Sequence, residues 1–144
     1  MNAEEMTTHI HDAEVLAAIR SVETRSSGEV RVFITNRSIA EPLKEARAVF
    51  TRLRMDQTAR RNAALVFLAP RSRQFALVGD EGLHQYCGEA FWNSCAEDLA
   101  AGFHAGDYTG ALIRVIERIG AVLARHFPPQ ENDHQELPDD VVRE

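Results

Sequence analysis

The first third of the chain alternates between two apolar periodicities. A helical spacing begins after Asp12, a typical helix N-cap, and ends at Ser26-Ser27-Gly28. Its apolar face would be formed by Val15, Leu16, Ile19 and Val22. Residues 29–35 are rich in β-branched side chains and partly alternate with polar ones, so this segment is predicted to be a strand.

A second helix, a buried strand and a return strand follow. Pro42 is suited to the first turn of a helix, which is predicted to end near Met55. Its predicted inward face consists of Leu43, Ala46, Val49, Phe50 and Leu53. Residues 63–69 are apolar on both faces, as in a strand covered by helices on both sides. A turn at 70–73 then predicts that residues 74–79 return as its antiparallel partner.

The last part of the chain reads as two helices. After Gly82, one apolar stripe contains Phe91, Trp92, Cys95, Leu99 and Phe103. Gly106 interrupts this pattern, and a final helix with Tyr108, Leu112, Val115, Ile116, Ile119 and Leu123 ends at Pro128-Pro129.

These elements predict a single-domain three-layer α/β/α sandwich with a small mixed sheet. Two strands joined through a helix are expected to be parallel, with a right-handed crossover, and the return strand adds an antiparallel third. We therefore expect an α/β/α domain over residues 1–127, followed by a proline-containing tail over 128–144. We expect this tail to be a flexible strap rather than a core element, with the alternative that Leu137 and Val141 pack it down, and we expect truncation after Pro129 to leave the fold intact.

Composition fits this class and limits the partners. Residues 128–144 hold six acids and one base, so they carry −5 of the net charge of −6. This balance argues against a general affinity for nucleic acid. No basic leader and no membrane-spanning apolar run are visible, and Cys87 and Cys95 are too far apart on a helix for a disulfide. We expect a cytoplasmic protein with two free thiols.

Strand direction is predicted to bring five polar residues to one edge of the sheet, the edge that is formed by the ends of the strands. The starts of the first two strands and the end of the third share that edge, where Glu29, Arg61, Asn62, Asp80 and Glu81 would converge. Carboxylate and amide oxygens suit hard cations. This arrangement predicts a calcium or magnesium site formed by Glu29, Asn62, Asp80 and Glu81.

The same residues also have a purely structural interpretation. Arg60 or Arg61 would pair with Glu29 or Asp80 and close the edge of the sheet. Other arginines lie nearby in sequence, but Arg71 and Arg73 belong to the hairpin turn at the opposite edge. If a phosphoryl group binds, we expect it at Arg61, beside the carboxylates and any cation.

Several short motifs, in this order, resemble the TPM domain family. They are Ser-Ser-Gly-Glu-Val-Arg-Val at 26–32, Arg-Asn-Ala-Ala-Leu at 61–65, Val-Gly-Asp-Glu-Gly at 78–82, Phe-Trp at 91–92 and Glu-Leu-Pro-Asp at 136–139. With smaller matches between them, they span residues 12–139. Two departures are Ala63, where the family motif usually has glycine, and Gln135, where it usually has asparagine.

The resemblance implies an α/β/α sandwich and links the chain with calcium binding, acid phosphatase activity and assembly or repair of membrane complexes. Carried onto this sequence, its acidic positions are Glu29, Asp80 and Glu81, beside Arg61 and Asn62. Two main functions follow, and a third hypothesis is a soluble regulator that carries only a partner-binding face around Trp92. The first is a non-catalytic binding or assembly module for an unknown protein partner, steadied by a divalent cation. The alternative is a metal-assisted phosphatase acting on a small phosphoester. There, Asp80 and Glu29 hold a metal-bound water and Arg61 faces the phosphate.

Overall fold

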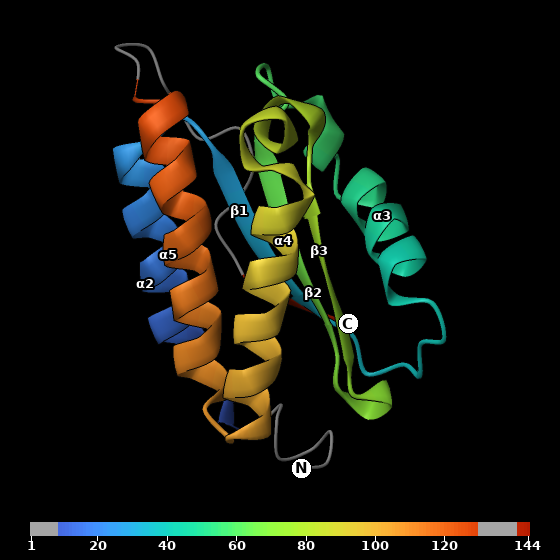
Figure 1. Cartoon of the computed structure of the whole chain (residues 1–144). Coiled ribbons are helices and arrows are strands. Elements are labelled where there is room, and N and C mark those ends of the chain that lie inside the picture. Colours follow the sequence, from blue (N-terminus) through green and yellow to red (C-terminus); the bar gives the residue numbers. More distant parts are fainter. Residues whose placement is uncertain (1–8, 130–140) are drawn as a thin grey trace.

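A four-stranded mixed sheet organises the chain, in the strand order β3-β2-β1-β4 (Figure 1). The computed structural model describes residues 9–129 and 141–144. Its strands are β1 (Glu29–Ile34), β2 (Ala63–Ala69), β3 (Gln74–Gly79) and β4 (Val141–Arg143). Its helices are α2 (Asp12–Arg25), α3 (Pro42–Arg52), α4 (Glu81–His104) and α5 (Tyr108–His126), with 3-10 turns η1 (Met55–Gln57) and η2 (Pro70–Ser72).

Strand pairing confirms the predicted directions. β1 and β2 are parallel, with Val32 beside Val66, and β3 runs antiparallel to β2, with Leu77 beside Val66. The helix α3 makes the crossover between the parallel strands, as the spacing predicted. The single-domain α/β class is therefore correct.

The sequence did not predict β4. This strand pairs in parallel with β1, and its first residue, Val141, lies beside Val32 and is only 7% exposed. The end of the tail is thus part of the sheet through Val141, one of the two residues that the sequence offered as able to pack the tail down. The acidic and Glu-Leu-Pro-Asp positions between 130 and 140 lie outside the described residues.

Helices cover both faces of the sheet. Figure 1 shows α2, α5 and α4 side by side on one face and α3 on the other. Side chains alternate between the two cores: Val30, Val32 and Ile34 pack under the three helices, whereas Phe33 packs on the α3 side. Every residue of β2 is buried, as expected for a central strand.

The predicted inward face of α3 is wrong at one position. Ala46, Val49 and Phe50 are buried, but Leu43 is 43% exposed. The reason lies in the strand order: α3 packs against β3, which is at the edge of the sheet, so part of the helix extends beyond the sheet.

The helix α4 contains a kink that the periodicity did not reveal. Gly88 has φ 72° and ψ 167°, which separates a short first segment from the longer second one. This backbone conformation is essentially restricted to glycine. Gly88 therefore sets the angle at which the start of α4 meets the end of β3.

Two further sequence predictions can be compared with the structure. Among residues 9–129 and 141–144, no helix combines the length and apolarity needed to cross a lipid bilayer. Cys87 and Cys95 form no disulfide, as predicted. Burial raises the pKa of Cys87 to about 11, and it also raises the pKa of Cys95.

Candidate functional site

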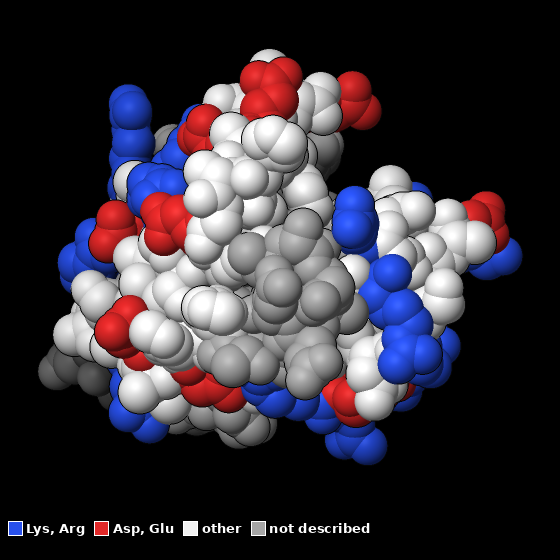
Figure 2. All heavy atoms as spheres, turned by 90° about the horizontal axis from the view of Figure 1, so that it is seen from below, with Lys and Arg blue, Asp and Glu red and all other residues white. Residues whose placement is uncertain are grey.

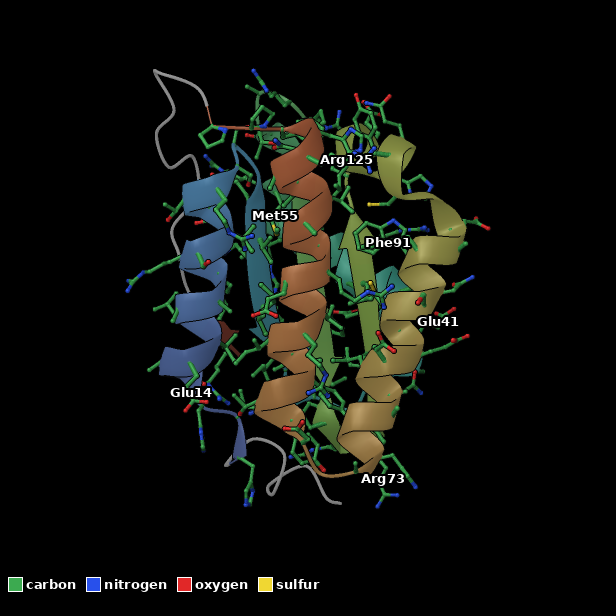
Figure 3. All side chains as sticks on the ribbon, turned by 60° about the vertical axis from the view of Figure 1, so that its left-hand side comes forward. Glu14, Glu41, Met55, Arg73, Phe91 and Arg125 are labelled. Atoms are coloured by element: carbon green, nitrogen blue, oxygen red, sulfur yellow. The ribbon has the colours of Figure 1, made fainter. Side chains whose placement is uncertain are left out.

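The sheet edge predicted from strand direction is formed by the backbone as expected. Glu29 lies beside Ala63 in the register, and the Asp80 N–H donates to the Ala63 carbonyl at 2.9 Å. The end of α5 reaches the same edge, because the Ser27 N–H donates to the Phe127 carbonyl at 2.8 Å. Figure 3 shows Arg125, near the end of α5, at one end of the molecule and Arg73 at the other. The hairpin arginines are thus separated from Arg61, as predicted.

Asp80 is the central residue of this edge. It is the N-cap of α4, and its Oδ1 accepts from the Glu81 N–H at 2.8 Å. The Arg61 guanidinium binds the same carboxylate with both arms of its fork, with Nε 2.6 Å from Oδ2 and Nη2 2.8 Å from Oδ1. The Asp80 side chain is only 7% exposed. This hydrogen bonding raises the pKa of Arg61 above its ordinary value.

Local backbone geometry holds the pair in place. Arg61 has a positive φ of 53°, which turns the chain into β2. The Leu83 N–H donates to the Arg61 carbonyl at 3.2 Å, so the first turn of α4 lies directly against this loop. A Cβ at Gly82 would overlap the carbonyl oxygens of Arg60 and Arg61. Gly82 is therefore required for this close approach. The sequence alone showed Gly82 only as part of the Val-Gly-Asp-Glu-Gly motif, without this structural reason.

The other predicted ligands differ from Asp80 in their burial and their partners. Glu81 is 75% exposed and contacts Arg61 Nη1 at 3.3 Å. Glu29 is buried, on the opposite face of β1 from Val30. Asn62 is buried too, and its Nδ2 donates to Ser27 Oγ at 3.4 Å. Its Oδ1 is buried and has no hydrogen-bond partner in the described structure.

These residues do not form a prepared calcium centre. Both oxygens of Asp80 are already bound by Arg61, whose positive charge occupies the place of a cation. Within the described part of the chain, no group of three or more His, Cys, Asp and Glu side chains is arranged to hold a metal ion. The unpartnered Asn62 Oδ1 is a suitable oxygen ligand, but one such atom does not make a site.

A second polar feature lies along β3, where the sequence suggested no groove but only a partner-binding face around Trp92. A hollow of about 260 Å³ separates α3 from α4 and is lined by Leu43, Arg47, His84 and Trp92, among others. Trp92 Nε1 donates to His84 Nδ1 at 3.1 Å, and a Cβ at Gly79 would overlap the Trp92 ring. The position of Gly79 thirteen residues before the single tryptophan was the available signal, but spacing alone did not reveal the contact.

Comparisons with known proteins agree with this fold. A family model described as TPM domain matches residues 6–122. No curated protein sequence matches the chain. The chain is similar to the NMR structure of the BA42 protein from the psychrophilic bacterium Bizionia argentinensis, with 30% identity and a TM-score of 0.81 over 100% of this chain and 95% of that one.

Two more distant structures share the fold alone. The N-terminal domain of the cg2496 protein from Corynebacterium glutamicum has 15% identity and a TM-score of 0.63, over 90% of this chain and 86% of that one. The N-terminal domain of a protein from P. gingivalis has 20% identity and a TM-score of 0.57, over 83% and 76%. These similarities support the architecture and carry no information on chemistry.

Proposed function

The chain belongs to the TPM domain family, and from that premise we propose that it is a non-catalytic binding or assembly module. One observation carries this proposal: the Asp80 carboxylate is bound by both arms of the Arg61 fork and by the first amide of α4. These contacts join the end of β3, the loop before β2 and the start of α4. In this interpretation the acidic edge is a structural clasp that fixes the binding surfaces of the domain.

The phosphatase alternative requires the same residues to bind a cation and the substrate instead of each other. A metal-assisted phosphatase would use Asp80 and Glu29 to hold a cation and its water, and Arg61 to bind the phosphate. In the present geometry, Asp80 and Arg61 instead neutralise each other. Hydrolysis would first require this pair to separate, which argues for the non-catalytic function.

Calcium or magnesium binding at Glu29, Asn62, Asp80 and Glu81 stays a prediction with a clear condition. A cation reaches Asp80 only after the Arg61 guanidinium leaves it. Titration with Ca²⁺, followed by amide shifts of Asp80 and Glu81, tests this competition. We expect Arg61→Gln to bind Ca²⁺ at least about tenfold more tightly than the wild type, because the competing charge is gone. Equal affinities would show that Arg61 does not compete.

Turnover of p-nitrophenyl phosphate tests the non-catalytic assignment directly. With Ca²⁺ or Mg²⁺ added, the turnover rate of the wild type is compared with the rates of Asp80→Asn and of a matched control, Asp98→Asn. Asp98 is an exposed aspartate that pairs with Arg118 on the helices, away from the clasp. We expect the same background rate in all three proteins. A rate that is lost in Asp80→Asn and retained in Asp98→Asn would contradict the proposal.

We also place the protein in the cytoplasm as part of this proposal. The support is that Cys87 and Cys95 are both unlinked thiols, as expected in a reducing compartment. Localisation of the full-length protein carrying a C-terminal fluorescent tag checks it.

A further inference from the structure

The strand β3 presents unused backbone hydrogen-bonding groups. In the described residues, β3 is an edge strand, with β2 as its only neighbour in the sheet. The Asp80 N–H donates to Ala63, and the antiparallel register then directs the N–H and C=O groups of Ala76 and Val78 toward β2 as well. The alternate groups, those of Phe75, Leu77 and Gly79, point away from the sheet. An edge of this kind is a template for a further strand.

Two helices form walls on either side of this edge. The hollow of about 260 Å³ has Leu77, Val78 and Gly79 on its floor. Leu43 and Arg47 line the wall formed by α3, and Trp92 and His84 line the wall formed by α4. A strand added to β3 would alternate its side chains between these two walls. One set would meet Leu43 and Arg47, and the other would meet the indole of Trp92.

Charge at the groove favours an acidic occupant. Arg47 in the groove, and Arg71 and Arg73 at the start of β3, are exposed and have no ion-pair partner among the residues that the structure describes. The acid lining the groove is Glu89, on the α4 wall. In Figure 2, Lys and Arg side chains lie on the right-hand side of the lower face, the side on which α3 lies in Figure 1, and others lie on the left-hand side. The α3 wall of the groove, through Arg47, and the turn before β3, through Arg71 and Arg73, are therefore positive.

We propose that the groove along β3 binds an extended acidic segment of a partner protein, which adds to the sheet beside β3. The segment has acidic residues at alternate positions, directed toward Arg47, and apolar residues between them, directed toward Trp92. Main-chain hydrogen bonds to Phe75, Leu77 and Gly79 supply affinity, and the two walls supply specificity. This inference rests on the proposed function as a binding module, for which it names the surface and the class of partner.

Amide hydrogen exchange and chemical shifts provide the test, with a synthetic peptide as the probe. The peptide alternates Glu and Val over eight residues, and a control peptide alternates Lys and Val. We expect the Glu peptide to shift the amides of residues 75, 77 and 79 and to slow their exchange. The amides of Ala76 and Val78, which face β2, are protected before the peptide is added and serve as an internal control.

Two charge reversals complete the test. Arg47→Glu is expected to weaken binding of the Glu peptide about tenfold, because it removes an ion pair and adds a repulsion. Arg125→Glu, a matched change of an exposed arginine at the opposite end from Arg73, is expected to leave affinity unchanged (Figure 3). Both positions are exposed, so the fold is retained in each variant.

Several outcomes would overturn the proposal. They are the absence of shifts at millimolar Glu peptide, an equal response to the Lys peptide, shifts confined to other surfaces, and equal affinity in Arg47→Glu. Concentration-dependent shifts of residues 75–79 without peptide would identify a second copy as the occupant and also overturn it. Phosphate hydrolysis is measured in a separate assay. If the protein hydrolyses the phosphate ester, the proposed non-catalytic function fails, whereas peptide binding is still decided by the shifts and exchange rates of residues 75, 77 and 79.

Discussion

Replacement of Gly88 by alanine tests whether the kink in α4 is built into the fold. The residue has φ 72° and ψ 167°, and a Cβ placed on it meets no atom within 4 Å. Steric overlap with neighbours therefore contributes nothing, and the cost comes from the backbone conformation alone. For a residue with a Cβ this conformation costs of order 1–3 kcal/mol.

A competing effect decides whether Gly88→Ala lowers or raises the free energy of unfolding. If α4 straightened, alanine would favour the helix over glycine by about 1 kcal/mol. Straightening, however, would displace the first turn of α4, where Leu83 binds Arg61 and Asp80 caps the helix. We therefore expect Gly88→Ala to lower the free energy of unfolding by about 2 kcal/mol, and the melting temperature by roughly 6 °C for a chain of this length.

Urea denaturation followed by far-UV circular dichroism gives the global stability of this variant. Fluorescence of Trp92, the single tryptophan, reports on the segment just after the kink. Ala100→Gly, an exposed position in the regular part of α4, is the matched control and should lose about 1 kcal/mol. Glycine would then be worse than alanine at 100 and better at 88. A Gly88→Ala protein as stable as the wild type, or more stable, would refute the reasoning.

Three further predictions follow from other parts of the structure. Deletion of residues 141–144 should cost about 3 kcal/mol, of which about 2 is the transfer free energy of the buried Val141 and about 1 comes from the contacts of Glu144, because the lost strand hydrogen bonds are offset by the entropy of ordering the strand; an unchanged urea midpoint would contradict this. The hydrogen bond from Thr35 and the charge of Arg37 lower the pKa of Glu144, so Glu144→Gln should cost about 1 kcal/mol at pH 7, above the ordinary carboxyl pKa, and nothing once the pH falls below the lowered pKa. A melting-temperature difference that persisted at pH 2 would contradict that sign. Alkylation of Cys87 by iodoacetamide at pH 7.5 should be roughly two orders of magnitude slower than that of an ordinary thiol, since its pKa of about 11 leaves little thiolate; mass spectrometry after timed quenching measures the rate.

The strands that the sequence predicted are those long enough to show a periodic pattern of apolar residues. β1, β2 and β3 were each recognisable from six or seven residues. β4 has three residues within an acidic tail, too few to show alternation. Its pairing with β1 depends on a partner more than a hundred residues away, which local pattern does not identify.

Errors and open alternatives at the site have a similar origin. Leu43 has the spacing of an inward residue, but its exposure depends on β3 being the edge strand. Arg61 and Asp80 were expected to meet, and the sequence left open whether they form a salt bridge or a site for a cation. Nine-tenths burial of Asp80 and two short hydrogen bonds from one guanidinium favour the salt bridge.

The sequence by itself determined the order of the helices and of the first three strands, the α/β/α class and membership of the TPM domain family. These properties depend on residues close together in the chain, whose periodicity fixes which face of each element is buried. Only the tertiary structure decided that Arg61 neutralises Asp80, that Val141 completes the sheet and that β3 is left with an unused edge between two helix walls. Each of these depends on contacts between distant segments, and the free energy of such contacts is set by the packed arrangement rather than by local sequence.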